Sequence, residues 1–182
     1  MKRIFKTIIL AIVLGGAVAV AFADEAQFKT RAIWVDPQSF GTADDVSEMI
    51  TRCQRAGLNL ILPNVMWNQT VYFKSPHFAG RIRANDTFDP LGDIIAKAHA
   101  AGIKVQAWCC VYYEGARDKA NTALHPAWLD RSFTGRPFEK NFLSPANSEV
   151  NPYLLSVMKD LLAYDVDGIH LDYIRYPCTA FD

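Results

Sequence analysis

The sequence has no excess of charge of either sign. It carries 19 lysine and arginine residues against 19 aspartate and glutamate residues, and the basic residues form no cluster. This balance argues against nucleic acid or an anionic surface as the main partner, because such partners select concentrated positive charge. The 182 residues are 51% hydrophobic, which suits one globular domain with a packed core and excludes a low-complexity or disordered chain.

The signatures of several cofactor and nucleophile sites are also missing. The sequence contains no P-loop, no G-x-S-x-G elbow and no H-E-x-x-H motif. Its four cysteines form no CxxC pair, which excludes a zinc ribbon and a thioredoxin-like motif. The four histidines are scattered, without metal-ligand spacing. We therefore predict no cofactor and no metal site, while a metal held in part by Asp36 or His170 stays open.

The amino terminus is the one strongly biased stretch. Basic residues among the first six positions precede an apolar run from Ile8 to Val20, and Ala21-Phe22-Ala23 supplies a small-residue cleavage pattern. We expect residues 1–23 to be a signal peptide, and residues 24–182 to be exported to the periplasm or the extracellular space without a lasting membrane anchor. The alternative is an uncleaved anchor, because the apolar run approaches the length that spans a membrane.

Export also bears on the state of the cysteines. An oxidising compartment permits disulfides, so Cys109 or Cys110 could pair with Cys178 if their strands are neighbours. Buried free thiols are the alternative, and the sequence does not decide between them.

Strand and helix patterns alternate along the rest of the chain. Apolar residues at helical spacing follow Thr42 and the Asp89-Pro90 pair, which are typical N-terminal helix signals, and a third such stretch begins at Asn151-Pro152. Short apolar runs between these stretches read as strands. We expect strands at residues 32–35, 58–62, 104–108 and 168–172, the second closed by Pro63, with Asn151 capping the last helix.

The connections differ in length by type. Links from helix to strand take one or two residues, whereas the links from strand to helix span about residues 63–88 and 110–147. Long loops at the carboxyl ends of parallel strands build the catalytic face of a (β/α)8 barrel. We therefore predict a partial (β/α)8 TIM barrel, about its first four β-α units. A doubly wound sheet is the alternative, although residues 36–41 lack its Gly-rich turn.

The length of the chain is short for that fold. A complete (β/α)8 barrel takes roughly 250 residues, and residues 24–182 hold about four repeats. We expect the sequence to be the truncated amino-terminal half of a barrel domain that is inactive alone. A half-barrel that dimerises is the alternative, because it would cover the two open sheet edges.

Asp172 is the leading candidate for catalysis. It lies at the predicted carboxyl end of the fourth strand, two residues after His170 and therefore on the same face. Glycoside hydrolysis uses a pair of carboxyl groups, one as acid and the other as nucleophile or base. His170 could bind a sugar hydroxyl, and Arg175 could hold Asp172 ionised. The alternatives are a core histidine and a structural Asp172–Arg175 ion pair.

Aromatic and polar residues are dense in the loops after the strands. Flat apolar rings with polar edges suit a sugar, which has apolar C–H faces and many hydroxyls. Several of these rings could instead anchor the loops. The predicted substrate-binding residues are Asp36, Asn64, Trp67, Trp108, Tyr112, His170, Tyr173 and Arg175.

Five blocks in order resemble the glycosyl-hydrolase-like 10 family. They are Arg31-Ala-Ile-Trp-Val-Asp36, Asp89-Pro-Leu, Ala98-His-Ala-Ala-Gly102 running to Ala107-Trp108, His125-Pro-Ala-Trp128, and Tyr164-Asp-Val-Asp-Gly-Ile-His-Leu-Asp-Tyr-Ile-Arg-Tyr-Pro177. The resemblance implies an exported bacterial TIM-barrel glycosidase, with a glycan substrate for which peptidoglycan strands are one candidate. It carries over Asp36, Trp108, His170, Asp172, Tyr173 and Arg175 as pocket residues.

The sequence departs from the family pattern at two points. Gln106 stands where relatives often have histidine, and Leu143-Ser-Pro145 stands where they often read L-N-P. Both leave the subsite details open, and the partner acid is expected beyond residue 182. The alternative function is a non-catalytic carbohydrate-binding barrel with the same aromatic rim.

Overall fold

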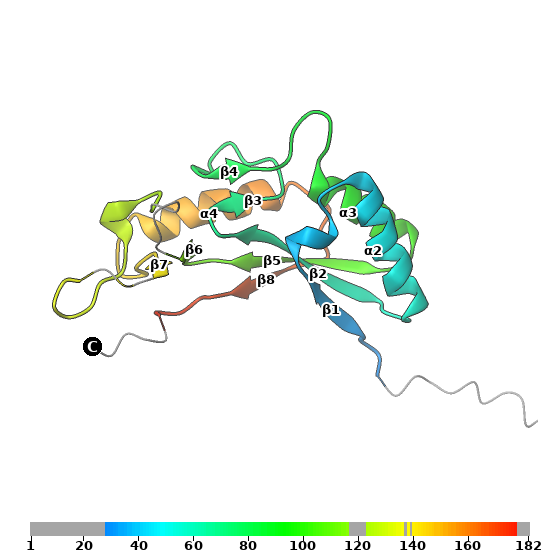
Figure 1. Cartoon of the computed structure of the whole chain (residues 1–182), viewed down its shortest axis with the longest axis horizontal. Coiled ribbons are helices and arrows are strands. Elements are labelled where there is room, and N and C mark those ends of the chain that lie inside the picture. Colours follow the sequence, from blue (N-terminus) through cyan, green and yellow to red (C-terminus); the bar gives the residue numbers. More distant parts are fainter. Residues whose placement is uncertain (1–27, 117–122, 137, 139, 178–182) are drawn as a thin grey trace, which may run out of the picture.

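Four parallel strands form the centre of a six-stranded sheet. The computed structural model describes residues 28–116, 123–136, 138 and 140–177. The strands lie side by side in chain order (Figure 1): β1 (Ala32–Val35), β2 (Leu60–Trp67), β5 (Lys104–Cys110) and β8 (Gly168–Asp172). A doubly wound sheet would reverse this order around its first strand, yet among the described strands β1 pairs with β2 alone. The protein is thus a mixed α/β protein with a mostly parallel sheet.

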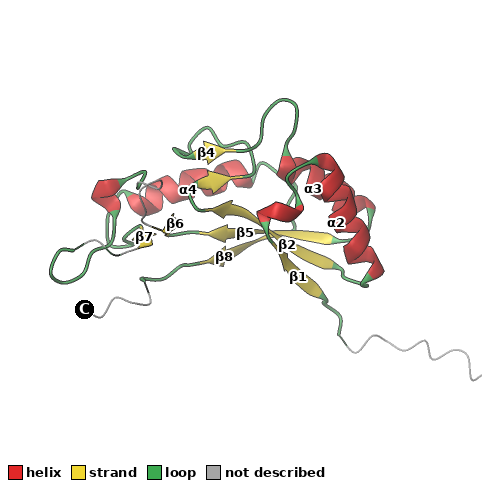
Figure 2. Ribbon diagram, viewed as in Figure 1, coloured by secondary structure: helices red, strands yellow, loops and turns green. Residues whose placement is uncertain are grey.

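Three helices connect these strands and lie on one side of the sheet (Figure 2). They are α2 (Ala43–Arg55), α3 (Pro90–Ala100) and α4 (Val150–Leu161). Their apolar faces and the strand residues turned toward them form one core, in which burial of apolar surface supplies the main stabilisation. This core includes Val46, Ile50, Leu91, Ile94, Leu154 and Val157 from the helices, and Ile61, Val65, Val105 and Ala107 from the strands.

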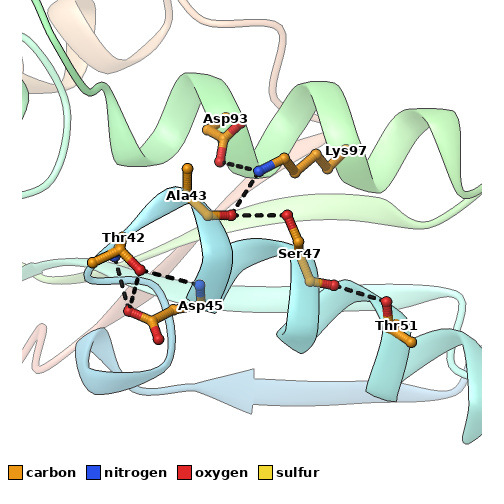
Figure 3. Close-up of polar contacts among 7 residues, drawn as sticks. All are labelled: Thr42, Ala43, Asp45, Ser47, Thr51, Asp93 and Lys97. Carbon is orange, nitrogen blue, oxygen red and sulfur yellow. Dashed lines mark hydrogen bonds and ion pairs between the residues drawn. The ribbon is translucent and has the colours of Figure 1, made fainter.

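The start of α2 confirms the predicted helix signal. Thr42 Oγ1 accepts the Asp45 N–H at 3.2 Å, and the Asp45 carboxylate accepts the Thr42 N–H at 2.9 Å (Figure 3). This reciprocal capping box satisfies two N–H groups that the helix itself leaves without partners. Lys97 of α3 donates to the Ala43 carbonyl at 2.8 Å and to Asp93 at 2.7 Å, which ties the two helices together.

The α3 boundaries follow the same local rules. Asp89 Oδ1 accepts the Gly92 N–H at 3.2 Å, and Pro90 occupies the first helical position. After α2 and α3 the chain turns at Gly57 (φ +67°) and Gly102 (φ +70°). Only glycine adopts that left-handed conformation without a steric cost from Cβ, so these two glycines end the helices where predicted.

Several predicted boundaries are wrong. The third strand continues past Trp108 to Cys110, and the second strand begins at Leu60 and continues through Pro63 to Trp67. The pairing of β2 with β5 passes from Ile61–Val105 to Asn64–Trp108 without Pro63, because proline has no N–H to donate to the neighbouring strand. The last helix begins at Val150 after Glu149, and its N-cap has no side-chain hydrogen bond. Asn151 is already inside the helix and accepts a hydrogen bond from Tyr112 instead of capping it.

The two long connections contain short elements that the sequence pattern did not predict. After β2 come β3 (Thr70–Val71) and β4 (Arg81–Ile82), and β3 extends the far end of β2 in antiparallel fashion. After β5 come β6 (Tyr113–Ala116) and β7 (Lys140–Phe142), which pair with each other. Single-turn 3-10 helices lie at Pro37–Ser39 and Pro126–Trp128.

Some predictions concern residues outside the described part of the chain. The signal peptide at residues 1–23 is one, and the pairing of Cys178 with Cys109 or Cys110 is another. Within the described ranges, no helix has both the length and the apolar character needed to cross a bilayer.

Candidate active site

The polar and aromatic candidates lie on the sheet face opposite the helices. Asn64 pairs with Trp108, which pairs with His170, so these three residues stand at one level across β2, β5 and β8. One step further toward the carboxyl ends, Cys110 pairs with Asp172. Alternate residues of a strand point to the same face, so the register brings all five together.

The Asp172 carboxylate is held by N–H donors on both oxygens. Trp108 Nε1 donates to Oδ2 at 3.0 Å, and the Tyr173 main-chain N–H donates to Oδ1 at 2.7 Å. The guanidinium of Arg175 lies 3.9 Å from Oδ1, which is the ion pair that the sequence predicted, although half of the Arg175 side chain is exposed. These donors fix the orientation of the carboxylate at the strand end.

Trp108, the ring that donates to this carboxylate, lines a cavity of about 370 Å³. The volume of the cavity lies in the range of sites that hold small ligands. Asp172 itself is not among the lining residues, and Trp108 links its carboxylate to the cavity. The lining combines polar groups and aromatic rings: Asp36, Pro37, Gln38, Asn64, Trp67, Tyr72, Trp108 and Tyr173.

Asn64 is buried in the floor of the site beside Cys110. Its Nδ2 donates to Cys110 Sγ at 3.8 Å, while Oδ1 is buried without a hydrogen-bond partner among the described residues. Burial, reinforced by the negative charge of Asp172, raises the pKa of Cys110 to about 12. The thiol is therefore neutral at physiological pH, and it is unsuited to nucleophilic attack or metal binding.

Two predicted residues make other contacts. The Tyr112 hydroxyl donates to Asn151 Oδ1 at 2.9 Å on α4, and Tyr112 does not line the cavity. His170 stays on the site face, where its Nε2 accepts the Trp34 Nε1–H at 3.4 Å. Sequence reasoning missed Trp34 as a member of this face. The sequence did indicate this position, because Trp34 lies two residues before Asp36 and the two side chains therefore point to one side of the strand.

Trp67 and Tyr173 belong to an aromatic cluster with Tyr113 and Phe142. The ring centroids of Tyr173 and Tyr113 are 5.0 Å apart, those of Trp67 and Tyr113 are 4.7 Å apart, and those of Phe142 and Tyr113 are 5.2 Å apart. Tyr113 and Phe142 were not predicted as part of the site. Their contribution depends on the pairing of β6 with β7, which brings together residues far apart in the sequence.

Glu114 is a buried carboxyl group that sequence reasoning also left out of the site. Its side chain is 6% exposed, and one oxygen accepts the Leu124 N–H at 3.2 Å. Burial raises its pKa to about 7, opposed by that hydrogen bond. It borders a small space of about 20 Å³ that is also lined by Trp67, Tyr113 and Tyr153.

The segment after Leu124 anchors this region to α4. The His125 ring stacks on Trp128 with centroids 3.9 Å apart and meets Tyr153 edge-on at 4.8 Å. Trp128 Nε1 donates to Glu149 at 3.0 Å. These rings therefore hold the loop against α4. Loop anchoring is the alternative role that the sequence left open for the aromatic residues.

Fold and site together define an α/β protein in which parallel strand ends present a carboxylate, polar side chains and aromatic rings around one cavity. The family model of Glycosyl hydrolase-like 10 matches residues 29–181, most of the chain. The chain belongs to that family, which confirms the resemblance in the sequence.

The chain is also similar to individual curated proteins. Glycosyl hydrolase DigH of Escherichia coli K12 is 25% identical over 143 residues, covering 69% of this chain and 33% of the relative. The chain thus spans about a third of the length of this curated relative. The name describes that relative and not this chain.

Solved structures share the fold. A hypothetical protein from Ruminiclostridium thermocellum ATCC 27405 matches with a TM-score of 0.63 at 18% identity, over 80% of this chain and 77% of that chain. Alpha-L-fucosidase isoenzyme 2 from Paenibacillus thiaminolyticus matches with a TM-score of 0.55 at 24% identity, over 84% and 25%. At these identities the likeness concerns the fold alone.

Proposed function

We propose that this chain supplies the first four β-α units of a (β/α)8 barrel and belongs to a glycoside hydrolase in which Asp172 is a catalytic carboxylate. The observation that carries the proposal is the position of Asp172 at the tip of the fourth parallel strand, held by Trp108 beside the cavity. The chain order of the parallel strands supports the barrel, and membership in the family supports the activity.

The contacts of Asp172 favour one of the two carboxylate roles in glycoside hydrolysis. Both oxygens accept an N–H donor, which fixes the orientation of the carboxylate and supports a role for Asp172 as the nucleophile or the base. A second carboxyl group then donates the proton. We propose that this acid lies outside residues 28–177. The distance between the two carboxyl groups decides whether the configuration is retained or inverted.

The cavity lining suits a glycan. Trp67 and Trp108 offer apolar ring surfaces, while Asp36 and Asn64 offer oxygens that accept hydrogen bonds from hydroxyl groups. We propose a cell-wall glycan as the substrate, with peptidoglycan strands as the first candidate, and export through the amino-terminal signal segment. The similarity to an S-layer-related protein of Niallia circulans, 25% identical over 85% of this chain, is consistent with a place at the cell surface.

A non-catalytic carbohydrate-binding protein is the second candidate function. It is favoured by the same cavity, because aromatic rings and a fixed carboxylate also bind sugar hydroxyls without any bond cleavage. The two functions differ in one measurable product, since only a hydrolase creates new reducing ends.

The test compares Asp172→Asn with the wild-type natural protein that carries this chain, using purified cell-wall glycan. The amide keeps the shape of the side chain but removes its charge. We expect reducing-end release to fall by roughly a thousandfold or more while glycan binding persists. Wild-type rates in the variant would remove Asp172 from catalysis. Binding without reducing ends in either protein would establish the second candidate.

A further inference from the structure

Tyr173 adopts a backbone conformation that its residue type disfavours. Its φ is +51°, in the left-handed region, where a Cβ atom meets the main chain. Asn68 and Gln69 share this conformation, with φ of +51° and +57°. They form the two-residue connection of a hairpin, because Trp67 pairs with Thr70, and such turns require positive φ. Tyr173 lies in no such hairpin, so its conformation needs another cause.

The peptide group that joins Asp172 to Tyr173 contacts the carboxylate of Asp172. Tyr173 follows Asp172 at the end of β8, and its main-chain N–H lies 2.7 Å from Asp172 Oδ1. This N–H is one of the two donors that fix the carboxylate. Disfavoured backbone conformations persist only where the surrounding structure enforces them, and they concentrate at functional sites.

Contacts to the Tyr173 ring supply that enforcement. Its centroid lies 5.0 Å from that of Tyr113, 5.7 Å from that of Trp67 and 6.1 Å from that of Phe142. The Arg175 guanidinium covers the same ring at 4.5 Å from its centroid. The three partner rings come from β6, β2 and β7, so the aromatic cluster fastens Tyr173 to three other strands.

We propose that the aromatic cluster of Trp67, Tyr113, Phe142 and Tyr173 positions the catalytic carboxylate of Asp172. The cluster compensates for the left-handed conformation of Tyr173 and holds its Cα atom in place. With the Cα atom of Asp172 held in β8, the peptide plane between the two residues is fixed, and its N–H stays on Asp172 Oδ1. Tyr173 is then a positioning residue that acts through Asp172. This inference rests on the proposed catalytic role of Asp172.

Phe142→Leu tests the inference, because Phe142 touches Tyr113 and Tyr173 but does not line the cavity. Leucine keeps the site apolar and removes the ring. The matched control is Phe73→Leu, the same change at a fully buried ring whose neighbour is Tyr164. Tyr113→Leu is a second cluster variant, to be used if Phe142→Leu does not fold.

Two readouts follow in the natural protein that carries this chain. In a cluster variant we expect kcat for reducing-end release from cell-wall glycan to fall roughly tenfold, with KM within about twofold of wild type. We also expect hydrogen exchange at the Tyr173 amide to accelerate roughly tenfold or more. The control variant should change neither quantity, although both substitutions lower the stability.

The two readouts separate the inference from the function on which it rests. Unchanged exchange at the Tyr173 amide in a folded cluster variant overturns the positioning role, whatever the activity. Faster exchange with unchanged kcat overturns it as well, because the carboxylate would then work without this N–H. Full activity of Asp172→Asn instead rejects the proposed function, and exchange at the Tyr173 amide then still reports on the cluster alone.

Discussion

The indole N–H of Trp108 donates to Asp172 Oδ2 at 3.0 Å across the neighbouring strands β5 and β8. This contact joins a cavity-lining ring to the candidate catalytic carboxylate. Under the proposed function it gives Trp108 two roles, one toward a bound sugar through the ring surface and one toward Asp172 through the N–H group. A substitution that preserves the ring and removes the N–H separates these roles.

Trp108→Phe is that substitution. Loss of a hydrogen bond to a charged group removes about 1.5–3 kcal/mol, so we expect kcat for glycan hydrolysis to fall roughly tenfold or more. KM should change less, because an aromatic ring still faces the cavity. The matched control is Trp128→Phe, which removes another indole N–H bonded to a carboxylate, that of Glu149 at 3.0 Å. Equal kcat values in wild type and Trp108→Phe would contradict this role.

Glu114 makes the stability of the chain depend on pH. Burial raises its pKa from 4.5 to about 7 in the folded state, so between these values the folded protein holds a proton that the unfolded chain has lost. The stability that Glu114 contributes is therefore greatest below about pH 4.5, decreases as the pH rises, and levels off above about pH 7. We expect this group to lower the free energy of unfolding by about 2–3 kcal/mol over that range.

Urea unfolding of the purified chain at about pH 5 and about pH 8 measures this effect. Glu114→Gln is the comparison, since the amide has the same shape and does not titrate. The decrease attributed to Glu114 should disappear in the variant. The same decrease in both proteins would assign it to other groups.

The capping box at Thr42 should contribute measurably to stability. Thr42→Ala removes the acceptor of the Asp45 N–H and leaves that donor at the helix end without its partner (Figure 3). We expect a loss of about 1 kcal/mol in the free energy of unfolding. Thr51→Ala lies on the same helix, where Thr51 bonds only to the Ser47 carbonyl, and it should change stability by less than about 0.5 kcal/mol. Equal losses in the two variants would show that the cap has no special effect.

Local signals predicted the framework well, because they depend on residues close in sequence. Thr42, Asp89 and the two helix-ending glycines act within a few residues of their own positions, and the structure confirms them. Asn151 is of a residue type that caps helices, but the prediction that it caps α4 is wrong, and its side-chain oxygen accepts a hydrogen bond from Tyr112 instead. Pro63 was read as a strand end, yet β2 continues past it with a gap in its pairing to β5.

The candidate site was predictable only in part, because sequence signals report on nearby residues and on strand register but not on distant packing. The predicted positions of Asp36, Asn64 and Trp108 on neighbouring strands hold in the structure, where these residues line one cavity. The burial of Glu114 and the cluster around Tyr173 depend on β6 and β7, short strands within a long connection that carries no periodic pattern. Contacts of this kind are set by tertiary packing and leave no local signal.

The central claim is that the strand ends converge on a sugar-binding cavity at which Asp172 acts. The most direct measurement is a crystal structure of the Asp172→Asn natural protein with an oligosaccharide cut from cell-wall glycan. We expect a sugar ring against Trp67 or Trp108, with its glycosidic carbon next to the side chain of residue 172. A sugar bound elsewhere, with residue 172 out of contact, would contradict the account.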